Sequence, residues 1–222
     1  MKKFFSIVIL ISGEGSNLQA ILTAIRHGLP VRIAAVLSDQ PMAYGLQRAQ
    51  AAGIPTLIVP KSAAMNSVAY DQALLNALSS FSPEWIVLAG FMRLLGSTFI
   101  AGYRHRILNI HPALLPQFPG LNTHQRVLEA PDKEHGASVH LVDEGLDTGR
   151  VLAQSRLLIH PTDTALTLKQ RVLHLEHQLY PYVLNLLATG RLRCEAETCW
   201  LDGKPLPSEG LSFQPQIHLQ PH

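Results

Sequence analysis

The sequence predicts a doubly wound α/β fold, in which a twisted, mostly parallel sheet carries helices on both faces. Short apolar runs rich in β-branched residues alternate with helix-like segments, and the connections between them are short. The first run, 5–11, is apolar and β-rich along its length, as expected of a parallel strand covered on both faces. Right-handed crossovers between such units lead to the doubly wound topology.

Each element follows from its local pattern, taken in chain order. We expect strands at 5–11, 31–37, 56–59, 84–89, 106–110, 137–142 and 151–159. We expect helices at 18–27, 44–52 and 68–78, and a long helix that begins after a cap at Thr162 or Asp163 and ends near Ala188. Pro181 is expected to kink that helix. A short C-terminal hairpin is expected at 191–201.

Length and composition predict a cytoplasmic, globular chain with one domain over residues 1–206. Of 222 residues, 47% are hydrophobic and 15% are charged, so a sizeable core can form. The net charge of +2, without runs of like charge, argues against a general nucleic-acid or membrane-surface binder. The basic, apolar start lacks a small-residue cleavage site, and no later stretch is long enough to span a bilayer.

Two smaller features complete the expected organisation. Residues 207–222 are polar and contain proline, so we expect a flexible tail. Cys194 and Cys199 are too few for a disulfide framework and match no zinc motif. We therefore expect two small hydrophobic side chains there, and no metal site.

A glycine-containing loop at 12–17 follows the first strand. Gly13 and Gly15 permit a tight turn, and the helix that starts at Ser16 and Asn17 offers free N–H groups, which suits a phosphate. The loop is neither a dinucleotide fingerprint nor a Walker loop. A plain tight turn is an equal alternative, and we expect the Glu14 side chain to point outward.

Asn109 and His111 lie two residues apart at the end of a strand, and therefore on the same face. An amide donor beside an imidazole suits a developing oxyanion. A lone histidine is more often structural, but the prolines at 112, 116 and 119 make a rigid loop that would hold this one.

Two acidic positions complete the candidate site. The stretch 143–149 places carboxylates, Asp147 among them, between two strands; the alternatives are a hairpin turn or a cation site. A carboxylate beside an imidazole orients it and favours its protonated form. Glu176 falls at the edge of the apolar stripe of the long helix, where spacing alone favours an ordinary solvated residue over a ligand-binding one.

Several separated motifs resemble folate-dependent formyltransferases. They are Leu88-Ala89-Gly90-Phe91-Met92-Arg93, Leu108-Asn109-Ile110-His111-Pro112-Ala113-Leu114-Leu115-Pro116 and Phe118-Pro119-Gly120. The segment 11–18, Thr123-His124 and Trp200-Leu201-Asp202-Gly203 narrow the resemblance to the branch that formylates glycinamide ribonucleotide in purine biosynthesis. The resemblance covers about residues 5–207.

The resemblance implies a Rossmann-like formyltransferase fold, with acceptor binding in the N-terminal half and folate binding in the C-terminal half. The donor is then 10-formyltetrahydrofolate and the acceptor is the amine of glycinamide ribonucleotide, with no metal. The implied catalytic residues are Asn109, His111 and Asp147, and the implied acceptor-binding residues are Gly15, Ser16, Asn17 and Glu176. The implied folate-binding residues are Met92, Arg93, Leu94, Leu95, Asn109, Val142 and Asp143, with Ser138 and His140 as possible supports behind the catalytic residues.

Two positions depart from the pattern of the family, and other functions share part of it. Ser67 stands where some relatives carry an arginine near the donor's tail, and Glu14 stands where relatives often carry Asn or Arg. The alternatives are a formyltetrahydrofolate hydrolase, a methionyl-tRNA formyltransferase and a non-catalytic nucleotide-binding module of the same fold. The expected partners are small-molecule substrates alone, with neither nucleic acid nor membrane, and the expected assembly is a monomer or weak homodimer.

Overall fold

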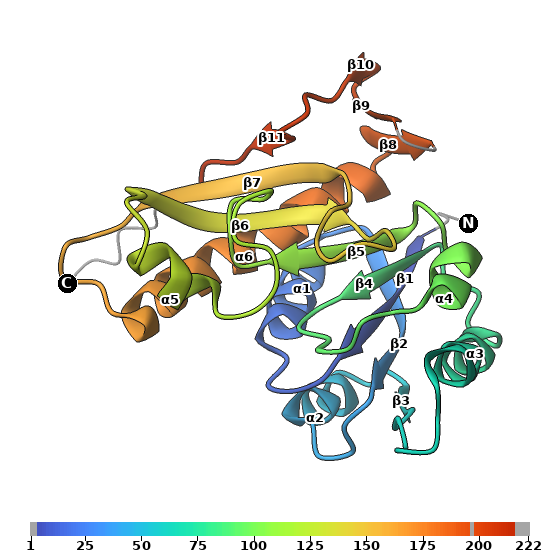
Figure 1. Ribbon diagram of the computed structural model, residues 1–222. Helices are drawn as coiled ribbons and strands as arrows, with labels where there is room; N and C mark the ends of the chain where they lie inside the picture. The colour runs from blue at the N-terminus through green and yellow to red at the C-terminus, as the bar shows by residue number, and fades with distance from the viewer. Residues whose placement is uncertain (1–3, 196–197, 216–222) are drawn as a thin grey trace.

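The computed structural model describes residues 4–195 and 198–215, and a doubly wound sheet organises them (Figure 1). The strands are β1 (Phe5–Ile11), β2 (Val31–Ser38), β3 (Thr56–Ile58), β4 (Trp85–Leu88), β5 (Ile107–His111), β6 (Glu134–Leu141), β7 (Val151–Leu158), β8 (Leu192–Glu195), β9 (Thr198–Leu201), β10 (Lys204–Pro205) and β11 (Leu211–Ser212). The helices are α1 (Ser16–Arg26), α2 (Tyr44–Ala51), α3 (Ser67–Leu78), α4 (Ser97–Gly102), α5 (Thr123–Leu128) and α6 (Ala165–Ala188).

The main sheet confirms the predicted fold class. Its strand order is β11-β7-β6-β5-β4-β1-β2-β3. The strands β5, β4, β1, β2 and β3 run parallel to one another, whereas β6 is antiparallel to both β5 and β7. The parallel part of the sheet therefore brings the loops that follow β1, β2 and β4 to one edge, where ligands bind in folds of this kind.

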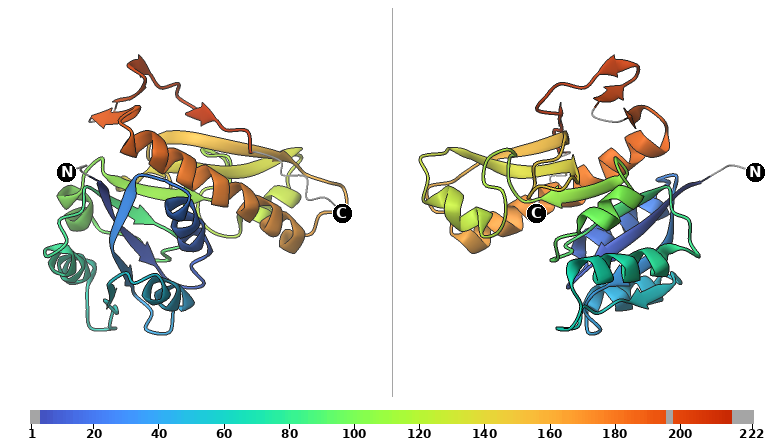
Figure 2. Two further views of the ribbon diagram at one scale, coloured as in Figure 1. Left: turned by 180° about the vertical axis from the view of Figure 1, so that it is seen from behind. Right: turned by 45° about the vertical axis from the view of Figure 1, so that its right-hand side comes forward.

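Helices cover both faces of the sheet, because each central strand is apolar on both sides. Ile7, Ile9 and Ile11 of β1 pack with residues of α1, α2 and α6, whereas Val8 and Leu10 pack with residues of α3 and α4. In the rear view of Figure 2, α6 crosses the sheet beside α1, with α3 and α4 on the other side. Burial of β1 on both faces explains its continuous apolar sequence.

The long helix α6 begins one or two residues later than the two predicted caps suggest. Thr164 is its N-cap and accepts a hydrogen bond from the backbone N–H of Thr167, so the expected cap at Thr162 or Asp163 is wrong. Asp163 instead accepts from the backbone N–H of His160 and pairs with Arg171. The helix continues through Pro181 to Ala188.

Two short helices, α4 and α5, were not predicted. Each spans six residues, which is too short for a clear apolar stripe, and α5 follows the proline-rich loop. Of the described helices, none is long and apolar enough to cross a membrane.

The C-terminal region is more ordered than the sequence suggests. The strands β8, β9 and β10 form a small antiparallel sheet at the top of Figure 1, which includes the expected hairpin. Cys194 and Cys199 lie opposite each other in it and form a disulfide, so the expectation of two unpaired hydrophobic side chains is wrong. Antiparallel register brought them together, which spacing alone did not reveal.

Part of the expected flexible tail is attached to the main sheet. Leu211 and Ser212 form β11, which pairs in parallel with β7. The backbone N–H of Phe213 donates to the Gln154 carbonyl at 2.8 Å, and the Phe213 ring lies 4.6 Å from that of Tyr182. The tail is therefore anchored at these residues, and 216–222 lie outside the described residues.

Candidate active site

A pocket of about 880 Å³ lies between the loops that follow β4 and β5 and the loop that joins β6 to β7. Its volume and its mixture of apolar side chains with a few polar groups suit a small-molecule ligand. It gathers residues that the sequence had singled out from separate segments: Met92, Arg93, Leu94, Leu95, Asn109, His111, His140, Val142, Asp143 and Asp147. The β5 strand and the 142–147 loop thus meet as predicted.

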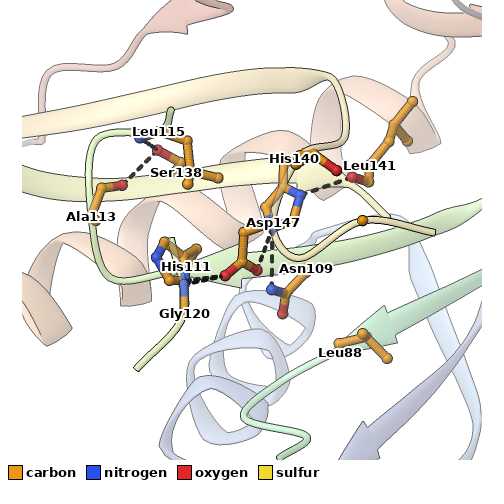
Figure 3. A network of polar contacts seen from close by, with 12 residues as sticks. Leu88, Asn109, His111, Ala113, Leu115, Gly120, Ser138, His140, Leu141 and Asp147 are labelled. Carbon is orange, nitrogen blue, oxygen red and sulfur yellow. Dashed lines mark hydrogen bonds and ion pairs between the residues drawn. The ribbon is translucent and has the colours of Figure 1, made fainter. Parts of the chain in front are cut away.

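His111 lies at the end of β5 and faces the Asp147 carboxylate (Figure 3), and each of its ring nitrogens has an acceptor. Its Nδ1 is 3.4 Å from Asp147 Oδ2, and its Nε2 is 2.9 Å from the Phe118 carbonyl oxygen. The side chain is buried, and the backbone N–H of Gly120 donates to Asp147 Oδ2 at 2.8 Å. Two facing acceptors complement an imidazolium, the form that donates from both nitrogens.

Both groups that face His111 belong to residues with a left-handed backbone. Phe118 has φ 53° and Asp147 has φ 54°. Residues other than glycine adopt this backbone conformation at a cost in free energy, and residues that do so cluster at functional sites. The backbone here is shaped to bring a carbonyl and a carboxylate to one imidazole.

Asn109 is oriented by His140 on the neighbouring strand (Figure 3). The His140 Nδ1 lies 2.8 Å from the Leu141 carbonyl, to which it must donate, so Nε2 accepts from Asn109 Nδ2 at 3.1 Å. Burial lowers the pKa of His140, which favours this neutral form. Among the described residues the second N–H of the Asn109 amide has no protein partner, so it can donate to a ligand.

Ser138 holds the rigid loop after His111 but does not line the pocket. Its hydroxyl donates to the Ala113 carbonyl at 2.6 Å and accepts from the Leu115 N–H at 3.0 Å. Gln154 on β7 adds a hydrogen bond to the Leu115 carbonyl at 2.7 Å. This buried network fixes the loop that carries His111.

The loop after β1 makes the tight turn that its glycines predict. Gly15 has φ 70° and sits against α2, since a Cβ on it would lie 2.6 Å from the Gly45 Cα. The Glu14 side chain points outward, as predicted, and pairs with Arg48 at 2.7 Å. Ser16 and Asn17 open α1, so the N–H groups of the first turn are available for an anion.

Glu176 is buried and contacts Asn17, so the reading of it as an ordinary solvated residue is wrong. Asn17 Nδ2 donates to Glu176 Oε2 at 2.7 Å, and Glu176 is 7% exposed. Burial raises the pKa of its carboxyl group to about 7, against the smaller lowering effects of Asn17 and Lys169. The packing of α6 on α1, which spacing along one helix cannot show, explains the burial.

The predicted acceptor residues form their own cluster and do not line the large pocket. Ser16 lines a smaller hollow of about 410 Å³ with Gln19, Arg48 and His177. The link to the large pocket is Tyr180, one turn after Glu176, whose hydroxyl donates to the carbonyls of Leu88 and Leu108. Tyr180 thus fixes α6 to the end of β4 and to β5.

Several lining residues were not among the predicted site residues. The pocket also contains Gly120, Leu121, Asn122, Thr123, His124, Leu146 and Lys169. The motifs Phe118-Pro119-Gly120 and Thr123-His124 of this segment contributed to the family resemblance. No local sequence pattern, however, showed that α5 would lie beside Lys169. In the described part of the chain, no group of three or more His, Cys, Asp or Glu is arranged to hold a metal ion.

Comparison with known proteins places this geometry in a family. Residues 5–184 match the family model described as formyl transferase. The phosphoribosylglycinamide formyltransferase of Escherichia coli K12 is 44% identical over 206 residues, covering 92% of this chain and 97% of the relative. That of Bacillus subtilis 168 is 40% identical over 188 residues, covering 84% of this chain and 95% of the relative.

Solved structures agree with the sequence relatives. The phosphoribosylglycinamide formyltransferase of Coxiella burnetii, solved in complex with CHES, superposes with a TM-score of 0.91 at 49% identity. The match covers 96% of this chain and 100% of that one. The similarity therefore includes the whole fold and the segments that build the pocket.

Proposed function

The chain belongs to the formyl transferase family, and from this premise we propose how its site works. It is an enzyme of purine biosynthesis that transfers a formyl group to glycinamide ribonucleotide, as its relatives' names state for them. One observation carries the assignment of roles: Asn109, His111 and Asp147, from two segments, converge on one pocket in a chain that matches such relatives along nearly their whole length.

The chemistry we propose is addition of an amine to a formyl group, followed by loss of the folate. The neutral amine of the acceptor attacks the formyl carbon, and negative charge develops on the formyl oxygen. Asn109 donates to that oxygen through its second amide N–H. Protonated His111 donates to it through its Nε2–H, which turns to the formyl oxygen from the Phe118 carbonyl. The bond from the formyl carbon to the folate nitrogen then breaks, and the proton lost by the amine moves to that nitrogen.

Asp147 supports this chemistry through His111. Its carboxylate lies 3.4 Å from the His111 Nδ1 and stabilises the positive charge of the ring, while the hydrogen bond from Gly120 holds it in place. His140 does the same for Asn109 by accepting one amide proton and thereby directing the other. Both supports are fixed before substrate arrives, so little reorganisation accompanies the reaction.

We propose that the acceptor's phosphate binds at Gly15, Ser16 and Asn17, and that Glu176 contacts the acceptor next to it. The helix start supplies N–H donors, and Asn17 Oδ1 is a buried atom without a partner among the described residues, so it can accept from a ligand. The carboxyl group of Glu176 is fixed by Asn17 and suits a hydroxyl or amine donor.

The folate ring is proposed to occupy the pocket formed by the 92–95 segment, Val142 and Asp143. The pocket offers apolar side chains and loop backbone, which together suit a flat heteroaromatic ring. The donor we propose is 10-formyltetrahydrofolate. It brings its own reactive carbon, so the proposed reaction uses no metal.

Oligomeric state and location are further proposals. We expect a monomer or weak homodimer that acts on small molecules, without nucleic acid or membrane, in the cytoplasm.

A disulfide such as Cys194–Cys199 is uncommon in a reducing cytoplasm. Alkylation of the protein in fresh cell lysate, read by mass spectrometry, would report whether the two thiols are free there.

The decisive experiment follows tetrahydrofolate release from 10-formyltetrahydrofolate by absorbance, with and without glycinamide ribonucleotide. Release that requires the acceptor is the expected result. Equal release without acceptor would instead make the chain a hydrolase. Ligand-induced thermal stabilisation without turnover would indicate a binding module of the same fold.

A further inference from the structure

Three loops that follow neighbouring strands meet at one buried carboxylate. Ser12 follows β1, Asp39 follows β2, and Met92 and Arg93 lie in the loop after β4. Since β4, β1 and β2 are adjacent in the sheet, their carboxyl ends place these loops side by side. The loop after β1 carries the proposed phosphate site, and the loop after β4 carries part of the proposed folate pocket.

Asp39, in the loop after β2, joins the loops after β1 and β4 through short hydrogen bonds. Ser12 Oγ donates to Asp39 Oδ1 at 2.6 Å, and Arg93 Nε donates to Asp39 Oδ2 at 2.6 Å. The Ser12 hydroxyl in turn accepts from the backbone N–H of Met92 at 2.8 Å. A backbone bond, from the Ser12 N–H to the Gly90 carbonyl at 3.0 Å, reinforces the same junction.

Burial makes this junction hard to open. The Asp39 side chain is 2% exposed, whereas Arg93 is 34% exposed and lines the large pocket. A buried carboxylate is tolerated because charged and hydroxyl donors satisfy it, and removal of one donor leaves a charge that lacks compensation. The loops cannot move apart without breaking bonds to the Asp39 oxygens.

We propose that Asp39 is a positioning residue that holds the phosphate-binding loop and the folate-binding loop in fixed relation to each other. The inference rests on the proposed function, because it concerns the two substrates of that reaction. Transfer requires the acceptor's amine and the formyl carbon to meet at contact distance, and small misplacements of either cost rate. Asp39 touches neither reacting atom; it acts through Ser12 and Arg93.

The test compares three variants with a matched control. Asp39→Ala removes the carboxylate, Ser12→Ala removes the hydroxyl that joins it to Met92, and the double variant removes both. Asp202→Asn breaks another Arg–Asp pair, that of Arg191 at 2.7 Å, in the C-terminal hairpin outside the pocket. Each kcat is measured with both substrates saturating and is expressed per folded molecule.

We expect each single variant to lower kcat by about tenfold or more. The kcat of the double variant should lie within about threefold of the lower of the two single-variant kcat values. The reason is that both changes break the same chain of contacts. The control should stay within twofold of the unmodified protein. Single variants within twofold of the unmodified protein, or effects that multiply in the double variant, would overturn the proposal.

A second measurement separates this proposal from the proposed function. Hydrogen exchange of the Met92 amide, measured without substrates, reports the junction directly. Asp39→Ala should accelerate this exchange about tenfold or more, and Asp202→Asn should leave it unchanged. Unchanged exchange in Asp39→Ala would refute the loop connection. Acceptor-independent turnover by the unmodified protein would refute the proposed function while this result still stood.

Discussion

At the scale of single residues, the pocket presents donor side chains that neighbouring protein groups hold in a fixed orientation. His111 is held from both nitrogens, by Asp147 and by the Phe118 carbonyl, and Asn109 is held by His140. His140, Phe118 and Gly120 therefore matter as much to the geometry as the residues expected to touch the substrate. The atoms that they contribute are the His140 Nε2, the Phe118 carbonyl oxygen and the Gly120 N–H. Strand pairing positions the first of these, and the conformation of the loop after β5 positions the other two.

Replacement of His111 by alanine is expected to lower kcat by about a hundredfold or more, with a smaller change in either Michaelis constant. The reason is that its hydrogen bond strengthens as charge builds on the formyl oxygen. Steady-state kinetics with each substrate varied in turn would measure this, with His27→Ala on the surface as control. A rise in the Michaelis constants at unchanged kcat would show that His111 only binds substrate.

Replacement of Glu176 by glutamine, which does not titrate, tests the raised pKa of the buried carboxyl group. Its pKa is raised from 4.5 to about 7, so the folded protein keeps a proton that the unfolded chain releases between those values. The stability contributed by this group is therefore present below pH 4.5 and is lost as the pH rises through 7. Relative to Glu176→Gln, the unmodified protein should lose about 2 kcal/mol of unfolding free energy between pH 5 and pH 8.

Urea denaturation of both proteins at the two pH values measures this difference, and the comparison cancels the contributions of other groups. A difference that stays constant with pH would contradict the raised pKa. The functional counterpart is Glu176→Ala, which should mainly raise the Michaelis constant for the acceptor. A defect confined to the folate side would show that Glu176 was assigned to the wrong substrate.

At the scale of elements, the turn between β1 and α1 depends on the close approach of α2. Gly15 and Gly53 share φ 70°, but a Cβ on Gly15 would lie 2.6 Å from the Gly45 Cα, whereas a Cβ on Gly53 would meet nothing within 4 Å. Gly53→Ala thus measures the cost of the left-handed backbone alone. Gly15→Ala adds a collision that must displace the proposed phosphate-binding loop or α2.

We expect Gly53→Ala to cost about 1 kcal/mol of stability and to leave kinetics unchanged. Gly15→Ala should cost more than this and should raise the Michaelis constant for the acceptor about tenfold or more. Urea denaturation and steady-state kinetics on both variants provide the comparison. Equal behaviour of the two variants would mean that the contact with α2 does not shape the loop.

At the scale of the whole molecule, the contact between half-buried His124 and buried His135 predicts sensitivity to acid. His124 Nδ1 lies 3.1 Å from His135 Nε2, and burial lowers the pKa of both rings to about 4. The unfolded chain therefore binds protons below about pH 6.5 that the folded protein does not, so stability is full above that value and falls as the pH drops toward 4.

Replacement of His124 by asparagine, which does not titrate, should reduce this acid-induced loss by about 1–3 kcal/mol at pH 4.5. Urea midpoints between pH 4.5 and 7.5 measure it, and His27→Asn on the surface serves as the control. An unaltered pH dependence in His124→Asn would place the acid sensitivity elsewhere, for example at His140.

Much of this organisation could be predicted from the order of the amino acids. Apolar, β-branched runs separated by amphipathic segments predict buried parallel strands and covering helices, because hydrophobic burial and backbone hydrogen bonding act locally and with a fixed period. The same local logic placed Asn109 and His111 on one face, and the motifs around them identified the family. The residues predicted for catalysis and folate binding, from Met92 to Asp147, line one pocket.

Only the tertiary structure decided the remaining features, because they depend on segments far apart in the chain. The burial of Glu176 requires α1 against α6, the bond from Asn109 to His140 requires antiparallel register, and the Asp39 junction requires three strands in order. The disulfide and the anchoring of β11 likewise arise from strand pairing. Periodicity reports which face of an element is buried, but the partner on that face is chosen by packing of the whole chain.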